Sequence, residues 1–276
     1  MLIFCCGLMR SGSTLQYQLT ETLIQKLGRG SGYGWLPSIK NRDEVFNRAT
    51  ETDPESYYIV KIHGYNPDFL RLIEQGKASA IYVYRDLRDV VTSFMSWQNT
   101  SFEGVIREKW IEKVLTDSQN WEALNNIHIS KYETAVNNLY DEVLAIANHL
   151  SLDVRTEILQ EVAEQCSLKK TQKRMQSLTQ KNQKSDNQNI LHHNHIKSGM
   201  AQRYKKELTP TQIALIETKT AVWMKSHGYE LEYSSFITRE FLAMPARCQQ
   251  LASEVTFEAK RSKGKLDRYV QENLRT

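Results

Sequence analysis

The first 27 residues constrain the fold of this chain more than any other segment. Residues 2–6 are all apolar, which is typical of a short strand that is buried on both faces. A loop rich in glycine, serine and threonine follows at 7–14. Leucines at positions 15, 19, 23 and 27 then predict an amphipathic helix over 14–27. A buried strand that leads through a tight loop into a helix is the first half of a βαβ unit, so the sequence predicts an α/β protein.

The rest of the chain repeats this alternation. Further strands are predicted from three apolar runs: Tyr57–His63, Ala80–Tyr84 and Ile127–Ser130. Helical patterns lie at 66–76, 87–97, 105–124, 134–150 and 154–166, and a capped helix is predicted from Thr209 to about Ser226. Residues 28–36 contain four glycines, so a loop is expected there. Strands that alternate with helices favour right-handed crossovers and a mostly parallel sheet.

Composition narrows the class of protein. The chain has 276 residues, of which 40% are hydrophobic and 25% charged, and its net charge is only +4. These values fit a soluble domain with a sizeable core and argue against a dedicated nucleic-acid binder. No apolar stretch approaches the length of a membrane span, and no signal peptide is recognisable. We therefore expect a cytoplasmic protein, without a membrane association, whose cysteines are reduced: Cys5, Cys6, Cys166 and Cys248.

The loop after the first strand has the chemistry of an anion site. Backbone N–H groups and the start of a helix together bind phosphate-like groups. The loop is close in spacing to the nucleotide-binding P-loop, but Ser13 stands where that motif has its lysine, and Arg10 is the only cation within it. A small-molecule kinase or NTPase is therefore the alternative function. A simple Ser/Gly turn that caps a helix is the structural alternative.

Two further pairs of residues follow strands. Lys61 and His63 stand at the end of the second apolar run, at the sheet edge where ligands gather, and a histidine there is suited to take a proton. Arg85 ends the third run, and Ser93 lies about two helical turns later, so both can converge on one anion. Taken singly, each of these residues also fits an ordinary strand end or helix face.

Together these motifs resemble the sulfotransferases that use 3′-phosphoadenosine-5′-phosphosulfate (PAPS), in particular compact soluble bacterial members. The resemblance implies a P-loop-like parallel sheet flanked by helices. It also implies that Arg10 contacts the 5′-phosphosulfate, that Lys61 stabilises the leaving phosphate and that His63 is the base. Donor contacts are implied for Arg10, Ser11, Gly12, Ser13, Thr14, Arg85, Ser93, Tyr132, Lys197 and Gly199. The product is adenosine 3′,5′-bisphosphate (PAP), and no metal is expected.

The resemblance covers residues 1–229, expected as one sulfotransferase domain. Tyr132 is implied to lie near the adenine, and Lys197 and Gly199 near the 3′-phosphate. The segment 166–206 holds ten Lys/Arg and one acid, which predicts a basic, mobile loop over the donor site. Residues 230–276 are expected to form a helical extension packed on this domain.

The acceptor is predicted to be a small molecule, sulfated on a hydroxyl or nitrogen, and a secondary metabolite such as a saxitoxin-type alkaloid is the favoured class. A nucleic-acid-binding role for 166–206 is disfavoured, because aromatic residues are nearly absent from it. The oligomeric state stays open. An aromatic acceptor pocket is expected from Tyr33, Trp35, Tyr65, Trp97 and Phe102. Either Asp43 or Glu44 would favour a cationic acceptor.

Overall fold

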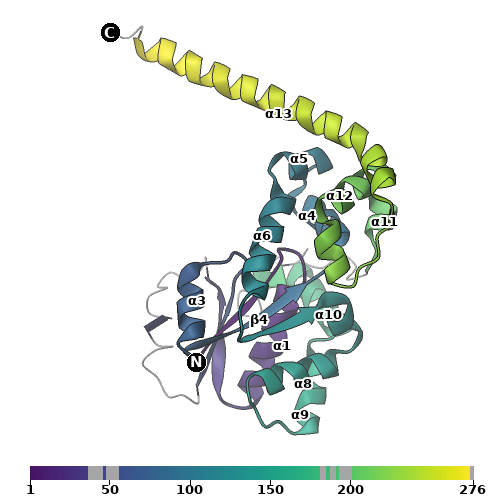
Figure 1. Cartoon of the computed structure of the whole chain (residues 1–276). Helices are drawn as coiled ribbons and strands as arrows, with labels where there is room; N and C mark the ends of the chain where they lie inside the picture. The colour runs from purple at the N-terminus through teal and green to yellow at the C-terminus, as the bar shows by residue number, and fades with distance from the viewer. Residues whose placement is uncertain (37–45, 48–55, 181–184, 187–190, 193–200, 274–276) are drawn as a thin grey trace. The chain divides into compact units, whose positions relative to one another are not determined.

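A computed structural model describes residues 1–36, 46–47, 56–180, 185–186, 191–192 and 201–273 (Figure 1). The chain divides into two compact units. Unit 1 comprises Met1–Asp86 with Thr116–Ala201, and unit 2 comprises Leu87–Leu115 with Gln202–Thr276. Each unit is described by itself.

Unit 1 is built on a five-stranded sheet in the order β2-β3-β1-β4-β5, and every pairing in it is parallel. The carboxyl ends of its strands therefore share one edge, where the loops after β1, β3 and β4 meet. The strands are β1 (Leu2–Gly7), β2 (Gly30–Trp35), β3 (Tyr57–Lys61), β4 (Ala78–Tyr84) and β5 (Ile127–Lys131).

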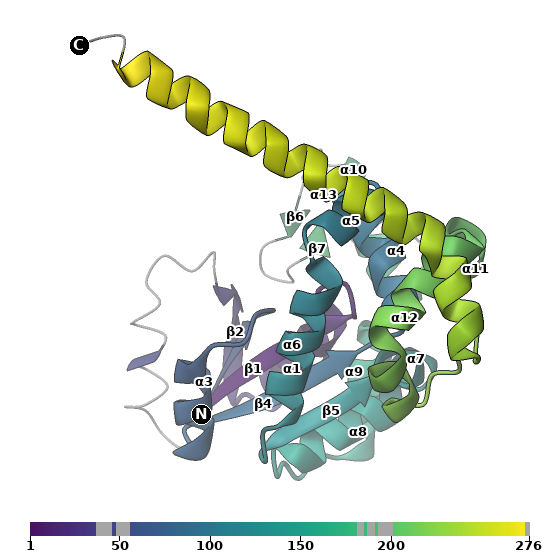
Figure 2. The same cartoon turned by 45° about the horizontal axis from the view of Figure 1, so that its top comes forward.

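Alternate residues of β1 face two separate layers. Ile3 and Cys5 belong to one core with α1 (Ser13–Lys26), α8 (Leu139–His149) and α9 (Thr156–Gln165), which Figure 2 shows grouped together. Phe4 points the other way. Its ring centroid lies 4.6 Å from that of Phe69 on α3 (Pro67–Glu74) and 6.5 Å from that of Trp121 on α6 (Trp110–Glu122). The sheet is thus covered on both faces, and the predicted α/β class is confirmed.

The expected loop at 28–36 is wrong, because most of it forms the edge strand β2. The sequence pattern does not indicate this strand, because its glycines lack the branched and aromatic side chains that are typical of strands. The pairing itself explains the glycine at position 30. A Cβ added to Gly30 would lie 1.9 Å from the carbonyl oxygen of Tyr57, so the two backbones approach too closely for a side chain. A register shift between Gly32 and Gly34 further disturbs the pattern.

The basic segment 166–206 is also more ordered at its start than expected. Its first part forms α10 (Leu168–Gln180), which buries Thr171 and Met175, two residues one helical turn apart. A short hairpin follows, formed by β6 (Ser185–Asp186) and β7 (Leu191–His192). Lys197 and Gly199 lie outside the described residues, so the cover over the donor site stays a prediction.

Unit 2 is helical. It contains α4 (Leu87–Gln98), α5 (Phe102–Arg107), α11 (Tyr204–Glu207), α12 (Pro210–Ser226) and α13 (Phe236–Asn273). The capping box predicted at Thr209 is present, with Pro210 at the first helical turn. The helix predicted over 105–124 is split, because Lys109 has a positive φ of 51° between α5 and α6. None of the helices within the described residues is long and apolar enough to cross a membrane.

Candidate functional site

The loop after β1 is held in place by Ser11. Its hydroxyl oxygen lies 2.6 Å from the carbonyl oxygen of Leu8 and 2.7 Å from that of Val83, so the two acceptors share its single proton. Its backbone N–H also donates to the carbonyl oxygen of Leu8. Val83 belongs to β4, so this serine ties the loop to the neighbouring strand. The side chain is fully buried. Ser11 thus positions the loop, and its predicted contact with the donor stays untested.

The start of α1 is available to an anion. Its N-cap is Gly12, which provides no side-chain cap, and the first turn holds no acidic residue. The positive end of the helix dipole therefore favours a negatively charged group. Gly12 has a φ of 108°, and an added Cβ would lie 2.5 Å from the ring of Tyr132, so only glycine allows this approach. Ser13 and Thr14, the first two residues of α1, are buried.

Lys61 ends β3 and reaches across to α1. Its Nζ donates to Oγ1 of Thr14 at 2.8 Å, and only 5% of the residue is exposed. Burial, with the charge of Arg10 as the next cause, lowers the pKa of Lys61 to about 8. Two of the predicted motifs, 47 residues apart in the sequence, thus meet at one sheet edge.

His63 follows two residues later at the same edge. Burial lowers the pKa of His63 to about 3, and the nearby charge of Lys61 is the second cause. A hydrogen bond with the backbone of Gly7 opposes this shift, and Arg10 contributes to it. The Nδ1 atom is buried and has no hydrogen-bond partner within the described part of the chain. The imidazole is therefore neutral near pH 7, which is the protonation state that a base requires.

Arg85 and Tyr132 meet beside the loop. The guanidinium of Arg85, a buried residue, lies 4.5 Å from the ring centroid of Tyr132, in a cation–π contact. Glu133, the next residue, accepts a hydrogen bond from the backbone N–H of Asp86 at 3.2 Å. Tyr132 thus contacts Gly12 with one part of its ring and carries the guanidinium of Arg85 on its face. Tyr132 brings the loop and Arg85 together, and the donor contacts predicted for these residues stay untested.

The remaining predicted residues are not brought to this cluster within unit 1. Ser93 is buried on α4 and belongs to unit 2, whereas Arg85 belongs to unit 1. Their shared 3′-phosphate site therefore stays a prediction. Lys197 and Gly199 lie outside the described residues. Within the described residues, no cluster of three or more His, Cys, Asp or Glu side chains is suited to a metal ion.

Comparison with known families decides the assignment. A model of the sulfotransferase domain matches residues 3–228 of this sequence, most of the chain. The chain belongs to the sulfotransferase family. It is therefore an enzyme of sulfuryl transfer, as the motifs predicted, and the match covers nearly the same residues as the resemblance did.

Solved structures agree on the sulfotransferase fold. Retinol dehydratase, in a complex with androsterone and inactive cofactor PAP, aligns with a TM-score of 0.58 at 16% identity over 84% of this chain and 82% of its own. Mouse sulfotransferase SULT7A1, complexed with PAP, aligns with a TM-score of 0.61 at 12% identity over 89% and 88%. A comparison with curated protein sequences finds no significant match.

Sequence reasoning missed the role of Asp89 in this sulfotransferase. Its carboxylate accepts hydrogen bonds from the backbone N–H groups of Gln202, at 2.7 Å, and Tyr204, at 3.0 Å. Asp89 thus fixes the chain directly after the segment that contains Lys197 and Gly199. The partners lie more than a hundred residues away in the sequence. No local signal identifies such a contact, although the residue stands within the arginine–serine motif.

Proposed function

We propose that this sulfotransferase transfers a sulfuryl group from PAPS to a hydroxyl or nitrogen of a small-molecule acceptor. The observation that carries the proposal is the hydrogen bond from Lys61 to Thr14, because it joins the Lys61–His63 pair to the loop after β1. When bound, PAPS would supply the sulfuryl group: the acceptor atom bonds to sulfur as the bond from sulfur to the 5′-phosphate oxygen breaks, which leaves PAP.

The residues at this edge suit an anionic donor. The uncapped start of α1 and the two cations Arg10 and Lys61 favour negative charge. Each cation disfavours the other while no anion lies between them, so an anion would relieve this repulsion. The PAP in the complexes of retinol dehydratase and SULT7A1 is consistent with this donor.

Each residue of the cluster has a distinct proposed role. The N–H groups at the start of α1, with Ser13 and Thr14, hold the 5′-phosphosulfate. Arg10 and Lys61 stabilise the charge that develops on the departing phosphate oxygen.

The 3′-phosphate has a separate proposed site. Arg85 holds it, together with Ser93 and the segment that carries Lys197 and Gly199. Tyr132 supports both the loop and Arg85.

His63 is proposed as the base that takes the acceptor proton. Its buried Nδ1, without a partner among the described residues, is the ring atom proposed to receive it. A pKa of about 3 is too low for an effective base near neutral pH. Lys61 and Arg10 contribute to that depression, so a dianionic group beside them would raise the pKa of His63 toward its useful range.

The acceptor is proposed to bind next to β2. Trp35 pairs in register with Lys61 across β2 and β3, and 43% of it is exposed. An exposed indole beside the reacting residues can stack on a flat or cationic molecule. Tyr33 packs on Tyr58, with 5.6 Å between ring centroids, and so supports the same strand. A nitrogen-rich cationic metabolite of the saxitoxin type fits this chemistry, and secondary metabolism is the proposed setting.

Thermal shift with three ligands tests the donor. We expect PAP to raise the melting temperature without metal, and ATP with magnesium to have no effect. Lys61→Met should reduce the PAP shift, whereas Lys26→Met should not, because Lys26 lies in the last turn of α1, at the opposite end from the loop, and pairs with Glu161 on α9. Stabilisation by ATP with magnesium alone would support the kinase or NTPase alternative. Mass spectrometry of acceptor panels incubated with PAPS then identifies the product.

A further inference from the structure

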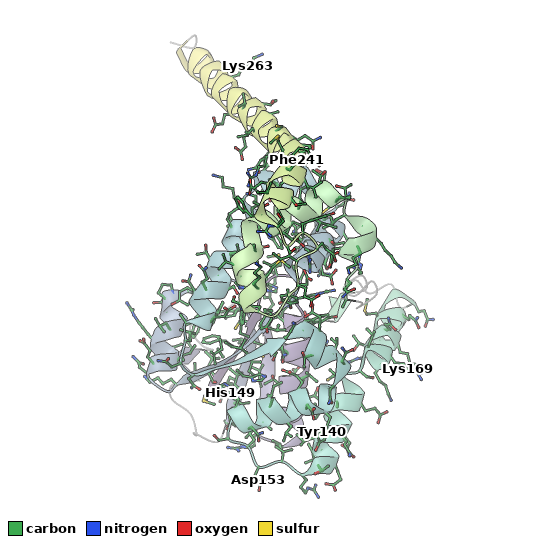
Figure 3. All side chains as sticks on the ribbon, turned by 45° about the vertical axis from the view of Figure 1, so that its right-hand side comes forward. Tyr140, His149, Asp153, Lys169, Phe241 and Lys263 are labelled. Atoms are coloured by element: carbon green, nitrogen blue, oxygen red, sulfur yellow. The ribbon has the colours of Figure 1, made fainter. Side chains whose placement is uncertain are left out.

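The last helix, α13, carries a long apolar stripe on its surface. We call this the outer stripe: Ile237, Phe241, Met244, Cys248, Leu251 and Val255. Its five large apolar side chains are each at least 56% exposed, and Cys248 is exposed as well. Figure 3 labels Phe241, which is 72% exposed, on this helix. A continuous exposed stripe of this kind marks an interaction surface.

The outer stripe is not the face that packs against unit 2. The residues that α13 buries are Arg239, Ala243 and Ala246. The helix itself packs against α12 and α5, which lie beside it in Figure 2. At roughly 100° per residue, these three lie on the opposite side of the helix from the stripe, which is itself only about 80° wide. Unit 2 is therefore complete without burying the stripe.

The spacing of the stripe indicates what kind of partner it has. Its residues follow one another at intervals of 4, 3, 4, 3 and 4, so every second residue recurs after seven positions. This is the heptad pattern by which one helix packs along another in a coiled coil. Phe241, Cys248 and Val255 occupy the first core position of each heptad. The partner is accordingly another long helix with a matching stripe.

The flanks of the stripe favour a second copy in the antiparallel direction. One flank is charged and alternates in sign through Glu240, Arg247 and Glu254, and the guanidinium of Arg247 bonds Glu240 within the same helix. The other flank consists of Thr238, Pro245 and Ala252. In a parallel pair the charged flank would face the uncharged one. In an antiparallel pair the charged flanks face each other, so Arg247 meets Glu254 of the second copy twice.

We propose that α13 pairs antiparallel with α13 of a second copy of this chain, about a two-fold axis between Cys248 and Leu251. In this register Cys248 packs on Leu251 of the second copy, and Met244 packs on Val255 of the second copy. These four stripe residues form the apolar centre, whereas Phe241 lies at its end, opposite Glu258 of the second copy. Such an interface is self-complementary, so it closes as a dimer. The proposal is independent of the donor site and goes beyond the proposed function.

Light scattering of the full chain tests the dimer. We expect twice the mass of one chain at high concentration, and dissociation on dilution. Met244→Glu/Leu251→Glu should give a monomer with unchanged circular dichroism. Val222→Glu is the matched control, because Val222 is 86% exposed on α12 but lies outside the stripe, and it should stay dimeric. A monomeric wild type, or a control that dissociates like the stripe variant, would overturn the proposal.

Charge exchange and thiol oxidation test the direction of pairing. Glu254→Arg should weaken the dimer severalfold, and Arg247→Glu/Glu254→Arg should restore it. Oxidised Leu251→Cys should form a covalent dimer through Cys248, since positions 248 and 251 face each other. Wild-type chains that crosslink through Cys248 alone would be parallel, and that result would overturn the antiparallel pairing. Failure of the double charge variant to recover the dimer would also overturn it. PAP binding should be unchanged in every variant.

Discussion

Two groups of charged residues in this chain, each with one buried cation, are built in opposite ways. In unit 2, Arg88 contacts Glu217 at 2.6 Å, and both side chains are almost completely buried. Glu217 also accepts hydrogen bonds from the backbone N–H groups of Glu232 and Tyr233. In unit 1, the buried ammonium of Lys61 donates to the hydroxyl of Thr14, and a second cation, Arg10, lies close enough to lower its pKa.

The difference separates a structural role from a functional one. A buried cation that is matched by a carboxylate and further hydrogen bonds stabilises the fold only while its partner remains. A buried cation that lies close to a second cation costs free energy of folding, and such an arrangement is typical of a functional site. The first pair should therefore control stability, and the second group should control donor binding and turnover.

The largest effect is expected at His63. His63→Gln should lower kcat by about 10²–10⁴-fold, because a positioned general base contributes that much, and should leave the affinity for PAP unchanged. Steady-state kinetics and calorimetry with PAP measure the two quantities. His227→Gln, at the C-cap of α12, is the matched control and should keep full activity. A His63→Gln variant with near wild-type kcat would remove the base from the mechanism.

The next largest effect is expected at the ion pair of Arg88 and Glu217 in unit 2. Glu217→Ala leaves the guanidinium of Arg88 buried without its carboxylate and should destabilise the protein by about 3–5 kcal/mol. Denaturant unfolding measures this loss. Lys61→Met should instead melt at a higher temperature than wild type at pH 7, because it removes a buried charge. If both variants lose stability equally, the contrast between the two groups does not hold.

The sequence predicts the residues at the carboxyl edge of the sheet better than the strand β2 beside them. Lys61, His63 and Arg85 are recognisable because each follows an apolar run, and parallel strands buried on both faces are continuous apolar runs. The strand β2 escapes prediction, since close backbone pairing selects Gly30 and removes the usual strand pattern. A glycine-rich edge strand therefore resembles a loop in sequence.

Roles that depend on distant partners are not predictable from spacing. The motif predicts that Ser11 contacts PAPS, yet its hydroxyl donates a hydrogen bond to the carbonyl oxygen of Val83, 72 residues away. Asp89 has no role predicted from the sequence, yet it accepts two hydrogen bonds from the chain near Tyr204. Such contacts arise from the packing of separate elements, so the residue types alone do not determine them.

A smaller effect, that of pH on donor binding, sharpens the comparison further. Because the pKa of Lys61 is about 8, its ammonium is charged at pH 7 and increasingly neutral above pH 8. The affinity for PAP should therefore fall as pH rises through about 8, approaching tenfold per pH unit. Lys61→Arg stays charged and should move this decline to higher pH. Lys26→Met should keep the wild-type profile.

The same group has the opposite effect on stability. A lysine whose folded pKa lies below its ordinary 10.5 destabilises the folded state while it is charged in both states. The advantage of Lys61→Met in melting temperature should therefore be full below about pH 8 and shrink as pH rises toward 10.5. Calorimetry of both proteins across this range measures the gap. A difference in melting temperature that is constant with pH would mean that it arises from packing and not from the buried charge. The buried ammonium of Lys61 would then not be a destabilising feature that serves an anionic donor.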